Sequence, residues 1–315
     1  MSFNQVRLNC CFPKGKLFYI EVNLRLFFYL LFKKADAVCA IDLDTILPCL
    51  FISQIKKIPR VYDAHELFCE MKEVVTRPFI HKCWKLIERF SVPKYKKGYT
   101  VSSPIADEFR KLYKVEYEVI RNMPVLSELV LSGQKEKYIL YQGAVNEGRS
   151  FETLIPAMKD VNCRLIICGE GNFMQQAKDL VKKNALEEKV IFKGMIAPLD
   201  LIKYTQGAYI GVTLFENKGK SNYFSLANRF FDYINAGVPQ LCVDYPVYKE
   251  TNKEYKIALL IDNLSPECIS KNLNNLLDND VVYQQLKNNC LKAREVFNWQ
   301  QEEKKLIHFY NQLFV

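Results

Sequence analysis

The strongest constraint on the fold is an alternation that runs along the whole chain. Short runs rich in β-branched and aromatic residues alternate with longer stretches of helical periodicity. This order is typical of parallel sheets whose crossover helices cover both faces, so we predict an α/β fold. The predicted strands are 37–41, 60–62, 98–101, 118–120, 138–142, 164–168, 190–192, 209–213, 240–243 and 258–261. The predicted helices are 17–34, 45–56, 79–94, 105–112, 151–158, 173–184, 199–205, 226–236, 266–277, 280–297 and 299–314.

A polar stretch at residues 122–137, which contains Pro124 and Gly133, interrupts the alternation and divides it into two α/β units. A chain of 315 residues with 49% hydrophobic residues is long and apolar enough for two such cores. We therefore predict a first domain at 1–133 and a second at 134–297. A final helix at 298–315 is expected to pack back toward the first domain.

Residues 17–32 form the most apolar stretch of the chain, although Glu21, Asn23 and Arg25 interrupt it. It is too short and too charged for a helix that spans a membrane. We predict a buried helix, with a helix lying on a membrane surface as the alternative.

The cysteines indicate the compartment of this protein, and its net charge indicates the class of its partners. The 11 cysteines are odd in number, show no CxxC spacing and sit mostly in apolar runs, which indicates buried thiols in a reducing, cytoplasmic setting. The three histidines have no cysteine pair at ligand spacing, so a zinc site is not expected. A net charge of +9 favours anionic partners, either nucleotide phosphates or an acidic membrane surface. Nucleic acid is not expected, because no nucleic-acid motif is present.

Residues 225–239 predict a helix with both ends specified, from an N-cap at Ser225 to Gly237 at the C′ position, followed by Pro239. One face of this helix carries Ser225, Asn228, Arg229 and Asp232. Phosphate groups bind at helix N-termini, and a carboxylate two turns further can accept the hydroxyls of a ribose. A nucleoside diphosphate therefore fits this helix. The alternative is an ordinary amphipathic helix that packs through Phe230 and Phe231.

A second candidate lies after the predicted strand 138–142, where a glycine-containing turn leads to Arg149. Its guanidinium is suited to clamp a diphosphate with two parallel hydrogen bonds, and the alternative is a surface arginine beside a turn. The turn Gly169-Glu-Gly171 lacks the full GxGxxG spacing, so a dinucleotide-binding fingerprint is not supported.

Taken together, these motifs resemble the retaining GT-B type glycosyltransferases (glycosyl transferases group 1, family 4-like). The resemblance runs from residue 138 to the C-terminus through Gly143…Gly148-Arg149, Gly169-Glu-Gly171, residues 190–194 and residues 225–239. Residues 61–68, with His65, resemble the strand-end histidine motif of the same class. The resemblance implies two Rossmann-like, doubly wound parallel-sheet domains that face a cleft.

The resemblance also implies roles for individual residues. His65 is expected to be catalytic, beside the transferred sugar, and Asp232 is expected to bind the ribose. The donor diphosphate is expected to contact Arg149, Ser225, Asn228 and Arg229. The vicinity of the donor sugar or base is expected to include Gly143, Gly194, Met195, Glu216 and Asn222. No metal and no cofactor are expected, and the pair Asp42 and Asp44 is expected to cap the helix that begins near Thr45.

Two departures from the family pattern qualify these expectations. Phe224 stands where the family commonly has a glutamate that contacts the donor sugar. The first domain begins with an apolar helix and lacks the opening strand and glycine-rich turn, so we expect it to be incomplete.

The sequence therefore predicts a glycosyltransferase that moves a sugar, with retention, from a nucleotide sugar to a saccharide or lipid-linked acceptor, in cell-surface polysaccharide synthesis. We expect it in the cytoplasm, with possible peripheral contact with anionic lipid at the inner face of the membrane. The alternatives are a catalytically inactive remnant that binds a nucleotide or a protein partner, and a nucleotide-sugar epimerase of the same fold.

Overall fold

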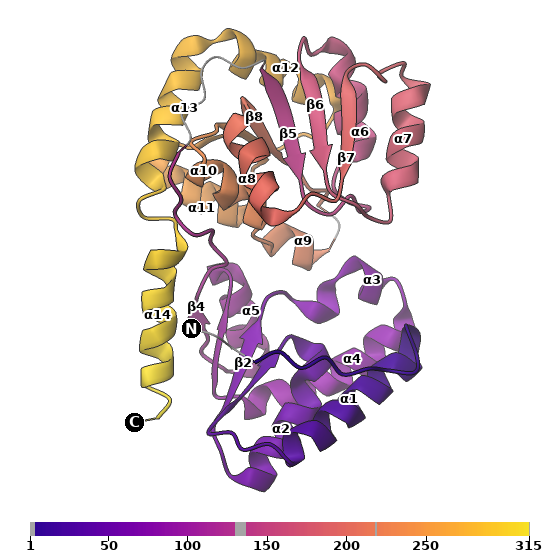
Figure 1. Ribbon diagram of the computed structural model, residues 1–315, viewed down its shortest axis with the longest axis vertical. Helices are drawn as coiled ribbons and strands as arrows, with labels where there is room; N and C mark the ends of the chain where they lie inside the picture. The colour runs from indigo at the N-terminus through magenta and orange to yellow at the C-terminus, as the bar shows by residue number, and fades with distance from the viewer. Residues whose placement is uncertain (1–3, 130–136, 218, 315) are drawn as a thin grey trace. The chain divides into compact units, whose positions relative to one another are not determined.

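The computed structural model describes residues 4–129, 137–217 and 219–314 and shows a mixed α/β protein with two parallel sheets (Figure 1). The chain separates into two compact units, one of residues 1–121 with 309–315 and the other of residues 122–308. This division falls before the predicted boundary at residue 133. The reason is that the linker-like residues are bound to the second unit: Leu126 N–H donates to Gln300 Oε1 at 2.9 Å and Trp299 N–H donates to the Pro124 carbonyl at 2.8 Å.

The first unit holds a four-stranded sheet in the order β1-β2-β3-β4, with every neighbouring pair parallel. Its strands are β1 (Val38–Ile41), β2 (Arg60–Ala64), β3 (Lys97–Thr100) and β4 (Glu118–Val119). Its helices are α1 (Gly15–Leu31), α2 (Ile46–Lys56), α3 (Lys72–Val75), α4 (Pro78–Ser91) and α5 (Ser103–Tyr113), with short 3-10 turns at Leu43–Thr45, Phe68–Glu70 and Val92–Lys94. The end of the last helix belongs to this unit, where the ring of Phe309 lies 5.2 Å from that of Tyr99.

The apolar helix α1 is not buried, which corrects the expectation for residues 17–32. None of its residues is fully buried, and Ile20 and Leu24 keep more than half of their surface exposed. It packs along α2, while Glu21 on another face holds the preceding segment through the backbone N–H groups of Cys11 and Phe12. Those bonds hold the pKa of Glu21 down to about 2. Among the described residues, no helix is both long and apolar enough to cross a bilayer.

The second unit holds a six-stranded parallel sheet in the order β10-β9-β8-β5-β6-β7. Its strands are β5 (Tyr138–Gln142), β6 (Arg164–Cys168), β7 (Val190–Gly194), β8 (Ile210–Thr213), β9 (Gln240–Val243) and β10 (Ala258–Ile261). Strand order therefore reverses between β5 and β8. In doubly wound sheets a ligand crevice forms at this reversal, beyond the carboxyl ends of the strands.

Helices cover both faces of the second sheet, as crossover connections between parallel strands require (Figure 1). The helices of this unit are α6 (Phe151–Ala157), α7 (Met174–Lys183), α8 (Pro198–Gly207), α9 (Lys220–Phe224), α10 (Asn228–Asn235), α11 (Pro246–Tyr255), α12 (Pro266–Asp278) and α13 (Asp280–Ala293), with a 3-10 turn at Met158–Asp160. The last helix, α14 (Trp299–Asn311), begins in this unit and ends in the first. Every predicted strand overlaps a strand of the structure. The predictions missed α3, α9 and α11.

Candidate functional site

The loops after β5, β6 and β7 are hydrogen-bonded into one surface at the carboxyl edge of the second sheet. Gly143 N–H donates to the Cys168 carbonyl at 2.9 Å, and Gly169 N–H donates to the Gly194 carbonyl at 2.8 Å. Gly169 has φ +145°, and a Cβ there would lie 1.9 Å from the Gly143 carbonyl oxygen. A side chain at residue 169 would therefore clash with the Gly143 backbone, and the positive φ would strain it as well.

We expect Gly169→Ala to destabilise the second unit by at least about 2 kcal/mol, because the clash is with backbone and the φ is strained. Gly15→Ala is the matched control, since Gly15 has φ +84° but no atom within 4 Å of its added Cβ. Urea denaturation of the two variants separates the clash from the backbone strain. Equal losses would show that the close approach of the two loops contributes nothing.

The helix that carries most of the predicted residues begins later than expected. Helix α10 starts at Asn228 with Ala227 at the N-cap position, so the prediction of a helix capped by Ser225 is wrong. Ser225 instead ends α9, where its hydroxyl donates to the Asn222 carbonyl at 2.9 Å. The expected end is confirmed: Gly237 has φ +67°, and the N–H groups of Gly237 and Val238 close a Schellman motif on Ile234 and Tyr233.

Arg229, in the first turn of α10, is a buried cation with unsatisfied hydrogen-bond donors. Only 7% of its surface is exposed, and its Nε and Nη2 have no hydrogen-bond partner among the described residues. Its guanidinium carbon lies 4.7 Å from the centre of the Tyr141 ring and 4.5 Å from that of Phe215. Buried donors of a charged group cost free energy when they are left unpaired, so this arrangement favours an anionic ligand.

Arg149 brings a second guanidinium to the same aromatic ring. Its central carbon also lies 4.5 Å from the centre of the Phe215 ring, and the side chain is partly exposed. The two arginines come from the loop after β5 and from α10, the two sides of the strand reversal. Together they concentrate positive charge where a diphosphate is bound in doubly wound folds.

Asp232 lies one turn after Arg229 on α10 and is held by a polar chain. Its Oδ2 accepts a hydrogen bond of 2.8 Å from Gln142 Nε2, and Gln142 Oε1 accepts one of 2.7 Å from the Thr205 hydroxyl. Burial raises the pKa of Asp232 to about 6, against the opposing effects of Gln142 and Arg229. The carboxylate is therefore short of hydrogen-bond donors, and the two hydroxyls of a ribose would supply them.

The other residues predicted near the donor lie on loops around these groups. Glu216 N–H donates to the Gly148 carbonyl at 2.9 Å, and Asn222 Nδ2 would lie 3.4 Å from a Cβ built on Gly148, so both are next to Arg149. Gly143 faces Arg229 Nη1, which would lie 3.3 Å from a Cβ there. At the end of β7, Gly194 has φ +66°, and Met195 after it is 76% exposed. Asn228 is exposed at the start of α10.

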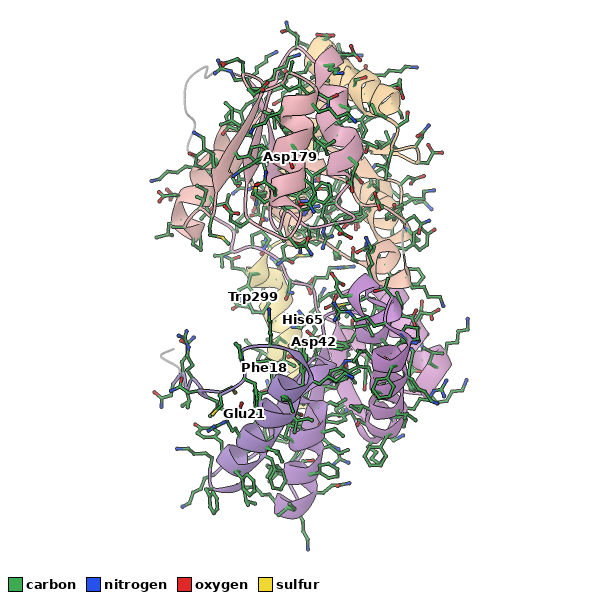
Figure 2. All side chains as sticks on the ribbon, turned by 90° about the vertical axis from the view of Figure 1, so that its right-hand side faces the viewer. Phe18, Glu21, Asp42, His65, Asp179 and Trp299 are labelled. Atoms are coloured by element: carbon green, nitrogen blue, oxygen red, sulfur yellow. The ribbon has the colours of Figure 1, made fainter. Side chains whose placement is uncertain are left out.

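His65 lies in the first unit near Asp42 (Figure 2), and two aspartates contact it. Its Nε2 is 3.2 Å from Asp63 Oδ1, and its backbone N–H donates to Asp42 Oδ1 at 2.9 Å. The bond to Asp63 raises the pKa of His65, against the effect of burial. Asp42, with φ +53°, makes no side-chain capping bond, and α2 has Thr45 at its N-cap position, so the expectation that Asp42 and Asp44 cap this helix is wrong.

Sequence reasoning missed several residues that shape these sites. Tyr141 and Phe215 position the arginines, and Gln142 positions Asp232. The sequence did indicate Asp63, because it lies with His65 at the carboxyl end of a predicted strand, where ligands of doubly wound sheets bind. No such local signal links Phe215 to Arg229, since they come from different loops.

The chain from residue 127 to residue 293 matches the family model of the glycosyl transferases group 1. This match covers more than half of the chain. The protein belongs to that family. No curated protein matches the chain in full-sequence comparison.

Solved structures of GT-B glycosyltransferases share its fold. A mutant of S. aureus TarM in complex with fondaparinux, α-GlcNAc-glycerol and UDP matches 91% of this chain with a TM-score of 0.72 and 16% identity, and the chain spans 58% of TarM. Anabaena HepE in complex with UDP-glucose matches 95%, with a TM-score of 0.77 and 11% identity, over 84% of its own length. Sucrose-phosphate synthase from Thermosynechococcus elongatus matches 94%, with a TM-score of 0.76 and 17% identity, over 77% of its length. The predicted pair of Rossmann-like parallel-sheet domains is confirmed by this likeness.

Proposed function

We propose that this protein transfers a sugar, with retention of configuration, from a nucleotide-sugar donor to a saccharide or lipid-linked acceptor. The observation that carries the proposal is Arg229, a buried guanidinium whose Nε and Nη2 have no partner in the described residues, beside Arg149 on one aromatic ring. Membership of the glycosyl transferases group 1 supports sugar transfer as the activity.

The two arginines suit the charge that develops when the donor breaks. Departure of a nucleoside diphosphate places negative charge on a phosphate oxygen, and fixed cations in a partly dry site stabilise such charge most effectively. In this proposal Arg149 and Arg229 hold the diphosphate, together with Asn228 at the start of α10 and Ser225 at the end of α9. The protein's own cations perform this role, so we propose transfer without a metal ion or a cofactor.

The groups next to the two arginines are proposed to bind the ribose and the rest of the donor. Asp232 accepts the ribose hydroxyls, since its carboxylate lies one turn beyond Arg229 and is held by Gln142. The loops with Gly143, Gly194 and Met195 would lie near the base or the sugar, as would Glu216 and Asn222 beside Arg149. UDP-glucose is the first probe, because HepE binds it.

His65 is proposed to act on the transferred sugar from the first unit. Asp63 fixes one ring nitrogen and favours the protonated imidazole. An oriented, partly charged imidazole can donate a hydrogen bond to a sugar hydroxyl and steady charge as the glycosidic bond breaks. We propose cell-surface polysaccharide synthesis at the inner face of the cytoplasmic membrane as the setting.

The test is a transfer assay with the full chain. A panel of nucleotide sugars is first screened by thermal shift, in which a ligand at a hundredfold excess over its Kd stabilises by about 2.7 kcal/mol. The donor that binds is then incubated, radiolabelled, with saccharide acceptors, and NMR of the product reports the anomeric configuration. We expect transfer with retention.

We expect His65→Gln to lower kcat by roughly 10²-fold or more while donor affinity stays within about twofold, because the imidazole acts in the transition state. His308→Gln, on α14, is the control and should retain full activity. Donor binding with neither transfer nor hydrolysis in the wild type would identify an inactive remnant. Interconversion of the free nucleotide sugar would identify an epimerase.

A further inference from the structure

The helices of the first unit enclose an apolar groove that the proposed transfer site does not use. The groove has a volume of about 820 Å³ and lies among α1, α2 and α4. Ring contacts join its walls: Tyr19 to Trp84 at 5.4 Å and Phe51 to Phe90 at 6.5 Å. Side chains that line it include Ile20, Leu24, Leu47, Phe51, Phe79 and Ile87.

The apolar side chains of this groove are open to solvent. Phe79 is 66% exposed, Ile20 58%, Leu24 54% and Phe51 41%. Single exposed apolar residues are ordinary, but a continuous apolar surface across three helices marks a binding surface. Helix α1 contributes no fully buried residue, so its apolar side chains are available to a partner.

The charged side chains that line the groove are positive. Lys16 and Arg77 line it, and among the described lining residues there is no aspartate or glutamate. Lys16 Nζ lies 4.6 Å from the centre of the Phe79 ring, and Lys94 Nζ lies 3.5 Å from that of Phe90. Exposed aromatic rings with ammonium groups beside them suit the boundary between acyl chains and charged headgroups. The charge therefore favours an anionic partner with an apolar interior.

We propose that this groove docks the first unit onto an anionic phospholipid bilayer. The side chains of Ile20, Leu24, Phe51 and Phe79 enter the boundary between headgroups and acyl chains. Lys16 and Arg77 bind lipid phosphates. This docking is peripheral and does not depend on sugar transfer, so it can be tested without a donor or an acceptor.

The test is co-sedimentation of the full chain with vesicles of phosphatidylcholine alone and with phosphatidylglycerol added. We expect binding to the anionic vesicles that weakens as salt rises, and little binding to the neutral ones. The double variant Leu24→Gln/Phe79→Ser should bind at least about tenfold more weakly, because two apolar side chains no longer leave water. Val281→Ser is the matched control, since Val281 is 79% exposed on α13 of the second unit.

The charge contribution is tested separately. Lys16→Gln and Arg77→Gln should each weaken binding about fivefold, while the exposed Lys178→Gln on α7 should leave it unchanged. Because all these residues are exposed, thermal unfolding of the variants should match the wild type. Equal binding of the groove variants and the wild type would overturn the proposal. So would absence of vesicle binding together with self-association in sedimentation velocity that Leu24→Gln/Phe79→Ser abolishes, because the groove would then bind protein.

Discussion

Arg229→Met is expected to lower the affinity for the nucleotide-sugar donor by about 100-fold without lowering the free energy of unfolding. The guanidinium is buried, and two of its nitrogens lack a hydrogen-bond partner in the described residues. Charge-assisted bonds to a diphosphate contribute about 1.5–3 kcal/mol each, and their loss gives the predicted fall in affinity. Methionine keeps the contact with the rings of Tyr141 and Phe215 and removes the buried charge, a change that is often neutral or stabilising.

The matched control is Arg294→Met, because Arg294 is also buried in the second unit, at 9% exposure. Its Nη2 donates to the Ser127 carbonyl, so this variant should lose stability and keep donor affinity. Isothermal titration calorimetry at pH 8 and urea denaturation measure the two quantities. Donor affinity within twofold of the wild type for Arg229→Met would remove Arg229 from the diphosphate site. A loss of stability equal to that of Arg294→Met would make it a structural residue.

Asp232→Asn is expected to remove a pH dependence of both stability and donor binding. The native carboxyl has a pKa of about 6, raised by burial from the ordinary value of 3.8. The folded state therefore binds the proton more tightly than the unfolded state does. Through this group, stability rises as pH falls from about 7 to about 4, and above pH 6 the buried carboxylate costs roughly 2–3 kcal/mol. Asp232→Asn should exceed the wild type in stability by up to this amount at pH 8 and match it near pH 4.

Donor binding should have the opposite dependence, since ribose hydroxyls donate to the ionised carboxylate. Wild-type affinity for UDP-glucose should fall about tenfold for each pH unit below 6, and Asp232→Asn should bind weakly at every pH. UDP-glucose has no phosphate that titrates in this pH range. A change in its affinity therefore reports the titration of groups on the protein.

The control for both measurements is Asp179→Asn, an exposed residue on α7 that also accepts a glutamine hydrogen bond, of 3.0 Å from Gln175 (Figure 2). Its stability should follow the wild type at each pH. Identical pH profiles for the wild type and Asp232→Asn would show that this carboxyl is ionised normally in the folded protein.

Local sequence patterns were sufficient to predict much of the fold. Each predicted strand overlaps an observed one because buried parallel strands are short β-branched runs bounded by turn residues. The end of α10 was also predictable from local sequence, since Gly237 and Pro239 terminate a helix through their own backbone conformation. The start of α10 was not. The hydroxyl of Ser225 is engaged by the Asn222 carbonyl of α9, a helix that the periodicity did not indicate.

The sequence by itself determined the order of the strands, the parallel sheets and the residue types gathered near residues 149 and 229, because these depend on neighbours along the chain. Only the tertiary structure decided that α1 stays exposed, since its hydrophobicity is the same whether or not another element covers it. Only the tertiary structure brought Arg149 and Arg229 to the ring of Phe215 and left Arg229 buried, with two of its nitrogens unpartnered among the described residues. Burial and the proximity of loops far apart in sequence arise from packing, and no local pattern encodes them.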